Sequence, residues 1–396
     1  MKFTYNSLIV LSIFGLLSAK SNSLNAQNSL SEAEKQSIIQ QVKKEVLDSL
    51  KEKPKKPFGQ ISDAFSISGY LETYYTYDFG NPSNHTRPSF TYSHNRHNEI
   101  NLNLGYIKAA FNTDKVRANL ALAAGTYMNA NYASEPNVLK NIYEANGGFK
   151  ISKKHDLWID AGIFSSHIGF ESAVGKDNWT LTRSLFADNS PYFETGAKIS
   201  YTTPNGKWFL SGLVLNGWQR IHRVDGNNLP AFGHQITYKP NSKITLNSSS
   251  FVGSDKPDST RQMRYFHNLY GIFQVHEKFG VTVGFDIGAE QKSKGSSAYN
   301  TWFTPVLLLK VNATEKLSIT ARGEYFSDAN GVIIATGTPN NFQAFGYSLN
   351  LDYQIHNNVL WRIEGRGFTS KDKVFMMNEK ANNNNVFITT AIAISF

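Results

Sequence analysis

Apolar and polar residues alternate one by one in repeated stretches from Phe65 to the end of the chain. In the first stretch, Phe65, Ile67 and Leu71 share one face, while Glu72 and Asp78 share the other. Alternation with a period of two predicts β-strands that have one apolar and one polar face. We predict sixteen strands, at residues 65–79, 99–112, 116–127, 142–151, 157–167, 192–201, 208–217, 231–239, 244–253, 264–276, 279–291, 301–311, 317–327, 342–355, 359–370 and 386–396.

The connectors between these strands alternate in length. Short turns are predicted at 113–115, 152–156, 202–207, 240–243, 277–278, 312–316 and 356–358, and eight long connectors lie between them. Outer-membrane barrels have short periplasmic turns and long extracellular loops. Lipid offers no hydrogen bonds, so each strand must pair on both sides and the sheet must close. We therefore expect an all-β fold, a transmembrane antiparallel up-and-down β-barrel of about 16 strands.

The last strand ends on an aromatic residue at the chain terminus. Ile388, Ile392, Ile394 and Phe396 fall on one face of this strand. A strand this apolar would be a sticky edge in a soluble protein, whereas a barrel leaves no edge. We expect Phe396 to lie at the periplasmic rim, to close the sheet near Phe65, and to act as an assembly signal for the barrel-assembly machinery.

The first 60 residues divide into a signal and a spacer. Lys2, followed by the apolar run 8–17 and a cleavage site after Ala26, predicts a signal peptide over residues 1–26. That run is shorter than the roughly 20 residues a spanning helix needs. Residues 27–60 are predicted to form a short periplasmic helix and a Pro/Lys linker, and residues 61–396 the barrel. The helix is either a short coiled coil between protomers or a solvated spacer.

The composition of the chain excludes several classes of function. The chain has no cysteine, which excludes disulfides and thiolate sites. Its net charge is +9, but nine lysines against five acidic residues within 1–56 supply four of these charges. The excess on the barrel is mild, so we expect no nucleic-acid partner.

Several stretches resemble a known family. They are Gly69–Tyr75, Asp160–Glu171, Arg183–Leu185, Asn189–Gly196 and Asn216–Trp218. These stretches are similar to the putative beta-barrel porin-2 (OmpL-like) family of bacterial outer-membrane proteins, and the block 160–218 is the most specific. The resemblance covers about residues 60–396 and implies a porin-like barrel, without an established substrate or site.

The third long connector, 167–191, is the longest and most distinctive. In sixteen-stranded porins the third extracellular loop folds into the lumen, where its size and its charges set a constriction. We expect this connector to narrow the pore, with acidic side chains facing basic wall residues; the alternative is packing on the rim or against a neighbouring protomer. The constriction candidates are Glu171, Lys176, Asp177, Trp179, Arg183 and Asp188.

Strand parity places a second set of charged residues on the lumen wall. The turn after Ile355 sets Asp352 opposite Arg362, which predicts a structural ion pair. Arg322 and Arg366 have fewer obvious partners, so they are better candidates for steering permeants. Acids outnumber bases on this face, which does not predict anion selectivity. The predicted wall residues are Glu72, Asp78, Glu144, Asp160, Glu194, Asp286, Glu290, Glu324, Asp352 and Glu364, with Arg117, Lys150, Lys198, Lys310, Arg322, Arg362 and Arg366.

Tryptophans follow three of the short turns. The positions of Trp158, Trp208 and Trp361 indicate an aromatic girdle at the periplasmic interface. Lumen tyrosines together with Trp158 could instead form a sugar-stacking track, although simple packing is the favoured interpretation.

The sequence gives little support for an enzymatic function. His94 and His97 lie in a polar loop without nearby acidic partners, so no metal is expected. No nucleophile elbow or phosphate loop is present. We expect no cofactor and no enzyme, but an outer-membrane porin that passes small hydrophilic solutes by passive diffusion. The alternative is a non-conducting barrel acting as a surface adhesin or structural anchor; a hydrolase is a weaker third. The expected partners are outer-membrane lipid, the barrel-assembly machinery and small hydrophilic solutes. The number of strands also predicts that three copies of the chain form a homotrimer.

Overall fold

The computed structural model describes residues 33, 36–37, 40–41, 44 and 62–396. The chain separates into two units, Met1–Pro57 and Phe58–Phe396. The predicted signal peptide over residues 1–26 lies outside the described residues, as do most of the predicted helix and the Pro/Lys linker. The six described positions between 33 and 44 are helical and exposed.

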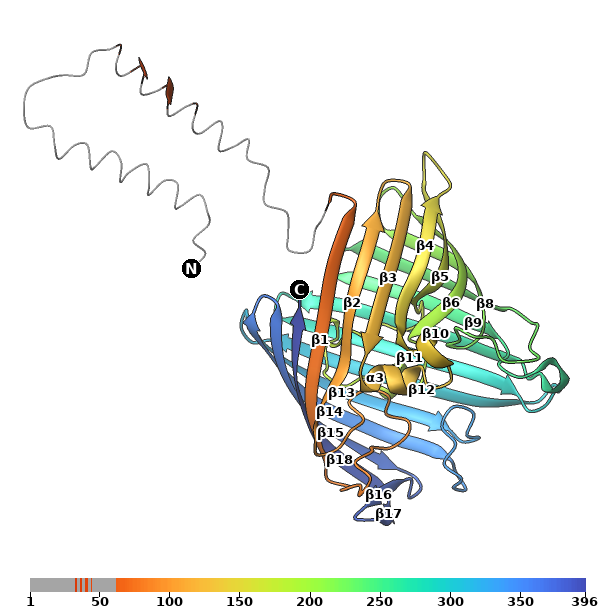
Figure 1. Cartoon of the computed structure of the whole chain (residues 1–396). Coiled ribbons are helices and arrows are strands. Elements are labelled where there is room, and N and C mark those ends of the chain that lie inside the picture. The colour runs from red at the N-terminus through yellow and green to blue at the C-terminus, as the bar shows by residue number, and fades with distance from the viewer. Residues whose placement is uncertain (1–32, 34–35, 38–39, 42–43, 45–61) are drawn as a thin grey trace, which may run out of the picture. The chain divides into compact units, whose positions relative to one another are not determined.

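The second unit is a closed antiparallel β-barrel of sixteen strands, as predicted (Figure 1). Each strand pairs with its neighbours in sequence, and β18 pairs with both β15 and β1. The strands are β1 Phe65–Asp78, β2 Ile100–Asn112, β3 Val116–Ala124, β4 Ile142–Lys150, β5 Asp156–Ser165, β6 Phe193–Thr202, β7 Trp208–Leu215, β8 Ala231–Asn241, β9 Ile244–Gly253, β10 Arg264–His276, β11 Phe279–Gln291, β12 Tyr299–Asn312, β13 Leu317–Asp328, β14 Phe342–His356, β15 Val359–Ser370 and β18 Asn384–Ser395.

Eight long loops and seven short turns join the strands in strict alternation, which confirms the predicted topology. The first to eighth loops are residues 79–99, 125–141, 166–192, 216–230, 254–263, 292–298, 329–341 and 371–383. The eighth loop contains the small hairpin β16 Phe375–Met377 and β17 Lys380–Asn382. Short helical turns are α3 Thr126–Asn131, η1 Asn137–Asn141, η2 Gly175–Asp177, α4 Leu185–Asp188 and η3 Asp258–Thr260. Within the part of the chain that the structure describes, no helix is both long and apolar enough to cross a membrane.

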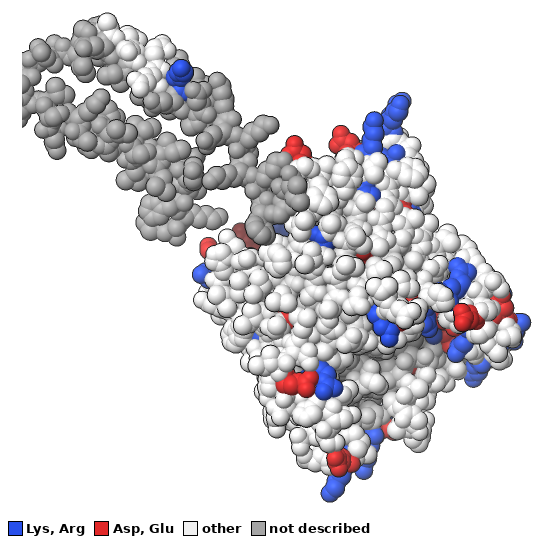
Figure 2. All heavy atoms as spheres, viewed as in Figure 1, with Lys and Arg blue, Asp and Glu red and all other residues white. Residues whose placement is uncertain are grey.

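The two faces of the strands differ as the alternation predicts. On β18, Val386, Ile388 and Ile392 are exposed on the outside, while Phe387 and Thr389 between them are buried inside. Charged side chains gather near the ends of the barrel, and the outer wall between them is mostly uncharged (Figure 2). Exposed apolar side chains on the outer face are what a lipid-facing wall requires.

The barrel closes at Phe396. Its backbone N–H donates to the Gly69 carbonyl oxygen (3.0 Å), and the Gly69 N–H donates to the Phe396 carbonyl oxygen (2.7 Å). A Cβ on Gly69 would lie only 2.3 Å from the Phe396 ring, so the ring lies directly over this glycine. Closure therefore occurs four residues beyond Phe65, at a glycine that leaves room for the terminal ring.

Two of the three tryptophans assigned to the girdle face outward. Trp208 is exposed and stacks on Tyr238 with ring centroids 4.2 Å apart, and Trp361 lies on the outer face of β15. The assignment of Trp158 to the girdle is wrong. It has the parity of inward-facing Asp160, is buried, and packs beneath the Arg117 guanidinium, 4.2 Å from the ring centroid.

Candidate functional site

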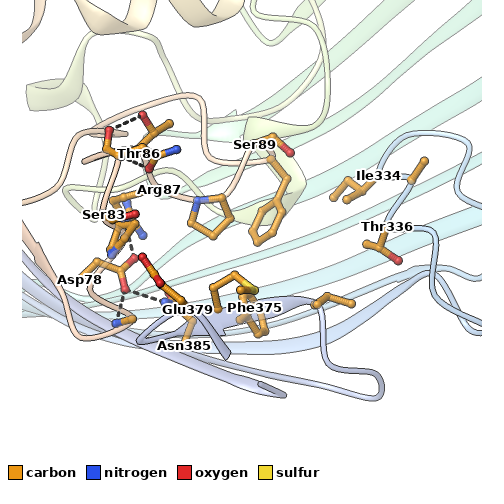
Figure 3. Close-up of a pocket in the computed structure, with 18 residues that line it drawn as sticks. Asp78, Ser83, Thr86, Arg87, Ser89, Ile334, Thr336, Phe375, Glu379 and Asn385 are labelled. Atoms are coloured by element: carbon orange, nitrogen blue, oxygen red, sulfur yellow. Dashed lines mark hydrogen bonds and ion pairs between the residues drawn. The ribbon is translucent and has the colours of Figure 1, made fainter. Parts of the chain in front are cut away.

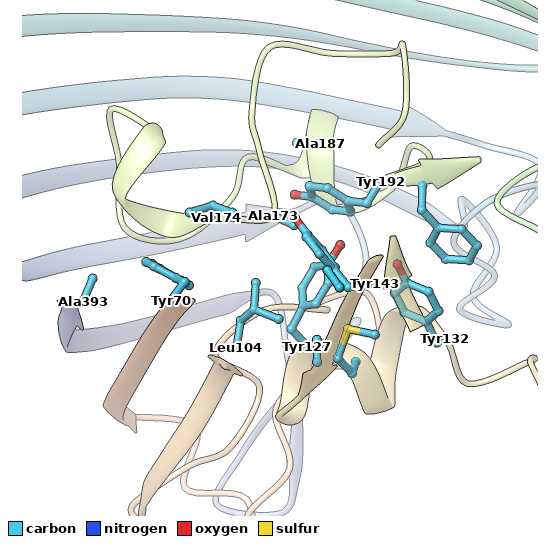
Figure 4. Close-up of a cluster of buried hydrophobic side chains, with 14 of the residues drawn as sticks. Tyr70, Leu104, Tyr127, Tyr132, Tyr143, Ala173, Val174, Ala187, Tyr192 and Ala393 are labelled. Carbon is cyan, nitrogen blue, oxygen red and sulfur yellow. The ribbon is translucent and has the colours of Figure 1, made fainter. Parts of the chain in front are cut away.

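The third loop lies against inward-facing side chains of the barrel. Residues 180–192 are all buried. Figure 4 shows Ala173, Val174 and Tyr192 of this loop beside side chains from β1, β2 and β4. Two local features shape it: the Ser184 hydroxyl caps α4 by accepting from the Ala187 N–H (3.2 Å), and a Cβ on Gly175 would collide with the Glu72 carboxylate.

Three arginines of the wall hold the loop backbone. Arg322 of β13 donates to the Thr182 carbonyl oxygen (2.7 Å) and to the Thr180 hydroxyl (2.9 Å). Arg366 of β15 donates to the Arg183 carbonyl oxygen (2.6 Å). Arg362 donates to the carbonyl oxygens of Gly175 (2.5 Å) and Asn178 (2.9 Å). Because charge-assisted hydrogen bonds are the strong ones, these contacts fix the loop against β13 and β15.

Acidic and amide side chains of the same wall accept the loop N–H groups. Glu364 accepts from the Thr182 N–H and Glu324 from the Leu185 N–H, both at 2.6 Å. Asn350 accepts from the Leu181 N–H (3.0 Å). The wall therefore satisfies both donors and acceptors of the buried loop, as a buried backbone requires.

Other strands contact the loop from different sides. The Gly169 N–H donates to Asn268 of β10 (3.3 Å). The Lys176 N–H donates to the Tyr70 hydroxyl of β1 (3.3 Å), and Lys176 Nζ donates to Ser395 Oγ of β18 (3.2 Å). Lys310 Nζ of β12 lies 5.7 Å from the centroid of the Trp179 ring. Strands around much of the barrel thus contact one loop.

The predicted loop residues separate into two groups. Glu171, Arg183 and Asp188 are buried, whereas Lys176 and Asp177 are exposed. Glu171 accepts from the Ser184 N–H (3.1 Å) and hydroxyl, with Arg322 at 4.0 Å. Arg183 donates to the Leu181 and Ala173 carbonyl oxygens, so it stabilises the loop itself. Burial raises the pKa of Asp188 to about 8 and raises that of Glu171, although Arg322 opposes the latter shift.

Most predicted wall charges are paired. The predicted Asp352–Arg362 pair is present and has two hydrogen bonds, of 2.7 and 2.9 Å. The prediction that Arg322 and Arg366 have few partners is wrong, because Arg322 pairs with Glu364 (2.7 Å) and Arg366 with Glu324 (2.5 Å). Further pairs include Arg117–Asp160, Arg264–Glu290, Lys108–Glu144 and Lys150–Asp156, while Asp286 accepts from Asn268. Glu194 is buried, and neither carboxylate oxygen has a hydrogen bond within the described chain.

The sequence did not predict that the first loop contacts charged residues of β1. Buried Arg87 pairs with Asp78 (3.3 Å), and buried His94 contacts Glu72 through Nε2 (2.9 Å). The interpretation that His94 lacks an acidic partner is therefore wrong, because β1 supplies one. Burial lowers the pKa of His94, although the hydrogen bond to Glu72 opposes the shift. The sequence of a polar loop does not show which residue of a distant strand its histidine will contact.

Tyrosines fill the space between the third loop and β1–β4. Tyr70, Tyr127, Tyr143 and Tyr192 belong to one buried cluster with Leu104 (Figure 4). The rings of Tyr106 and Tyr143 stack at 5.3 Å. These contacts are those of a packed core, which agrees with the packing interpretation of the inward tyrosines.

Two of the cavities that adjoin the third loop lie at different segments of it. One, of about 440 Å³, is lined by Asp188, Asn189, Tyr92 and Arg220 among others. The second, of about 360 Å³, is lined by Lys176, Asn178 and residues of the short 313–316 turn. They share no lining residue. Because one includes the long fourth loop and the other a short turn, the third loop lies between cavities that face opposite ends of the barrel.

A third cavity, of about 490 Å³, lies among the first, seventh and eighth loops. Figure 3 shows Asp78 and Arg87 on one side of this cavity and Ile334 and Thr336 on the opposite side. Asp78 accepts from Asn385 Nδ2 (2.7 Å) as well as from Arg87. This cavity is separate from the third loop.

The family model described as putative beta-barrel porin-2, OmpL-like, matches residues 64–396, which is the whole barrel. The chain belongs to this family. No curated protein is detectably similar in sequence. Membership places the barrel in the outer membrane, with the exposed apolar face of the strands toward lipid.

Solved structures share the fold of this porin-2 barrel at low sequence identity. The anion-selective porin from Comamonas acidovorans has a TM-score of 0.55 and 9% identity, covering 84% of this chain and 99% of its own. The channel DcaP of Acinetobacter baumannii has a TM-score of 0.54 and 11% identity, covering 84% and 97%. The trimer form of OmpT from Vibrio cholerae has a TM-score of 0.53 and 9% identity, covering 84% and 100%. The matching family and the shared fold are those of a porin barrel.

Proposed function

We propose that this barrel is a porin through which small hydrophilic solutes diffuse passively, and that the third loop sets its narrowest part. The observation that carries the proposal is the position of residues 166–192. They are tied by hydrogen bonds to β1, β10, β13, β15 and β18, and they lie between two cavities that face opposite ends of the barrel.

The charges near the loop support weak ion selectivity. Arg322, Arg362 and Arg366 each pair with a carboxylate, so much of their field is cancelled locally. Lys176 and Asp177 are the exposed charges of the loop, and they have opposite signs. A channel whose wall charges are paired, and whose loop exposes one charge of each sign, selects solutes by size more than by charge.

A liposome-swelling assay tests the proposed diffusion. Purified protein is reconstituted with a graded series of neutral sugars, and empty liposomes serve as the control. We expect swelling with the smallest sugars and a steep loss of rate as solute size increases, because a tethered loop sets a fixed aperture. The absence of swelling with every solute would contradict the porin proposal.

The alternative is a non-conducting barrel that acts as a surface adhesin or structural anchor. One observation favours it: the first three loops fill much of the interior, since Arg87, His94, Tyr127 and residues 180–192 are buried. Planar-bilayer recording separates the two functions, because a closed interior gives no stable conductance steps.

We also propose the partners that this function requires. Outer-membrane lipid surrounds the apolar wall, and the barrel-assembly machinery recognises the strand that ends in Phe396. A homotrimer is supported by OmpT of Vibrio cholerae, which shares the fold and has a trimer form.

A further inference from the structure

Lysines occupy one repeated position at the short turns of the barrel. In five of the seven hairpins, a lysine directly precedes the first residue of the strand that leaves the turn. Its backbone carbonyl oxygen accepts a hydrogen bond of 2.7 or 2.8 Å from the strand that follows, so the five positions are structurally equivalent. The lysines are Lys115, Lys207, Lys243, Lys278 and Lys316, and we call them the lysine collar.

Alternation along the strands places the lysine collar on the inner side of the sheet. The residue after each lysine belongs to the outer face, as exposed Val116 shows. The second residue after it belongs to the inner face: Arg117 pairs with inward Asp160, and Ser318 lines the cavity beside the third loop together with Lys316 itself. Because outer-membrane barrels have their short turns in the periplasm, the collar surrounds the periplasmic mouth.

The positive charge of the lysine collar is not neutralised by ion pairs. All five side chains are exposed, and no salt bridge within the described chain involves any of them. The short turns also contain Lys153 and Lys154, against the acidic residues Asp114, Glu277 and Glu315. Seven lysines against three acidic residues leave an excess of four positive charges at this end.

The cavity on the periplasmic side of the third loop continues this positive region inward. Lys176, Lys310 and Lys316 line it. Its acidic residues are Glu315 and Asp352, and Asp352 is paired with Arg362. A solute that moves between the mouth and the third loop therefore passes more positive than negative charge.

We propose that the lysine collar concentrates small anions at the periplasmic mouth, so that the barrel passes them in preference to cations. The inference rests on the proposed porin function and names the class of solute that it favours, small hydrophilic anions. Unpaired charges of one sign around an opening raise the local concentration of ions of the opposite sign, and rings of lysine favour anions in pores. The third loop, whose wall charges are paired, would still select by size.

The preference is expected to depend on salt concentration. The Debye length is about 10 Å at 0.1 M salt and about 3 Å at 1 M. Because the collar lysines are exposed, their field is screened by dissolved ions. We therefore expect a clear preference for anions near 0.1 M salt and its loss at 1 M.

The seventh short turn offers a variant that extends the lysine collar. Asn358 occupies the equivalent position there, since its carbonyl oxygen accepts from the Ser395 N–H of the following strand (3.0 Å). Asn358 is exposed, so a lysine can replace it without entering the packed interior. We expect Asn358→Lys to strengthen the preference for anions, which a merely structural role of the turn lysines would not produce.

The reversal potential in a KCl gradient, across a bilayer of neutral phosphatidylcholine, tests the proposal by giving the ratio of chloride to potassium permeability. We expect a ratio above one for the unmodified protein near 0.1 M salt. The double variant Lys243→Gln, Lys316→Gln is expected to lower this ratio about twofold, because one unit charge roughly 10 Å away in water changes a local ion concentration by that order. The matched control is Lys292→Gln, Lys294→Gln, which removes the same charge from exposed positions of the sixth loop and is expected to leave the ratio unchanged.

Three results would overturn the proposal. The unmodified protein could show no preference for chloride near 0.1 M salt, or the collar variant could keep the original ratio. The control could also lower the ratio as much as the collar variant, which would assign the preference to net charge and not to the periplasmic mouth. A complete absence of conductance steps would instead contradict the porin function itself, so the two failures are distinguishable.

Discussion

Arg322→Ala is expected to loosen the third loop and to make the single-channel current larger and noisier. Arg322 donates to Thr180 and Thr182 of the loop and also pairs with Glu364 of the wall. Its removal leaves the buried Glu364 carboxylate without its ion-pair partner, which costs on the order of 3–5 kcal/mol. Much of this cost would be relieved if the loop moved away and admitted water. Planar-bilayer recording, together with the unfolding temperature, measures both effects.

Arg117→Ala is the matched control for this prediction. Arg117 also lines the inner wall and forms an ion pair with Asp160, but it packs on Trp158 and not on the third loop. We expect a smaller loss of stability, because this pair is partly exposed, and no change in current noise. Arg322→Ala protein that inserts normally but conducts with unaltered amplitude and noise would show that the tether does not set the aperture.

Deletion of Phe396 is expected to reduce the amount of barrel inserted in the outer membrane. The deletion removes both backbone hydrogen bonds to Gly69, each contributing about 1 kcal/mol, together with the ring that covers this glycine. The pairing of β18 with β1 would then be one residue shorter. Molecules that do insert should conduct as before, because the third loop is unaffected.

Gly69→Leu provides an independent test of the same contact. The new side chain would occupy the position of the Phe396 ring, so we expect the same assembly defect with the terminus intact. Phe345→Ala is the control, since this exposed phenylalanine lies on the outer wall of β14 away from the closure. Quantitative blotting of outer-membrane fractions measures insertion; equal levels for all variants would rule out a role for the closure in assembly.

Strand positions and topology were predictable because each strand has a single buried face. One residue of register shift would put Glu72 and Asp78 into lipid, so the pattern determines the register strongly. The same argument placed Asp352 opposite Arg362, which the structure confirms. Consistent use of parity would also have placed Trp158 inside, since it lies two residues before Asp160.

The packing of the loops could not be read from the sequence. Arg322 and Arg366 lack obvious partners along their own strand pairs, but the third loop and neighbouring carboxylates supply them. His94 finds Glu72 only because the first loop folds inward. Loops have no periodicity that fixes their position, and their contacts depend on residues that are distant in the chain. The sequence nevertheless identified most of the charged residues that these loops meet.

The central claim is that the route through this barrel passes the third loop, and a thiol-block measurement tests it most directly. The chain has no cysteine, so Lys176→Cys introduces a single thiol at an exposed loop position that lines a cavity. A bulky methanethiosulfonate reagent added during planar-bilayer recording is predicted to lower the conductance by roughly half, by narrowing the route. Lys294→Cys, exposed in the sixth loop, should be unaffected. Complete modification of Lys176→Cys with unchanged conductance would contradict the account.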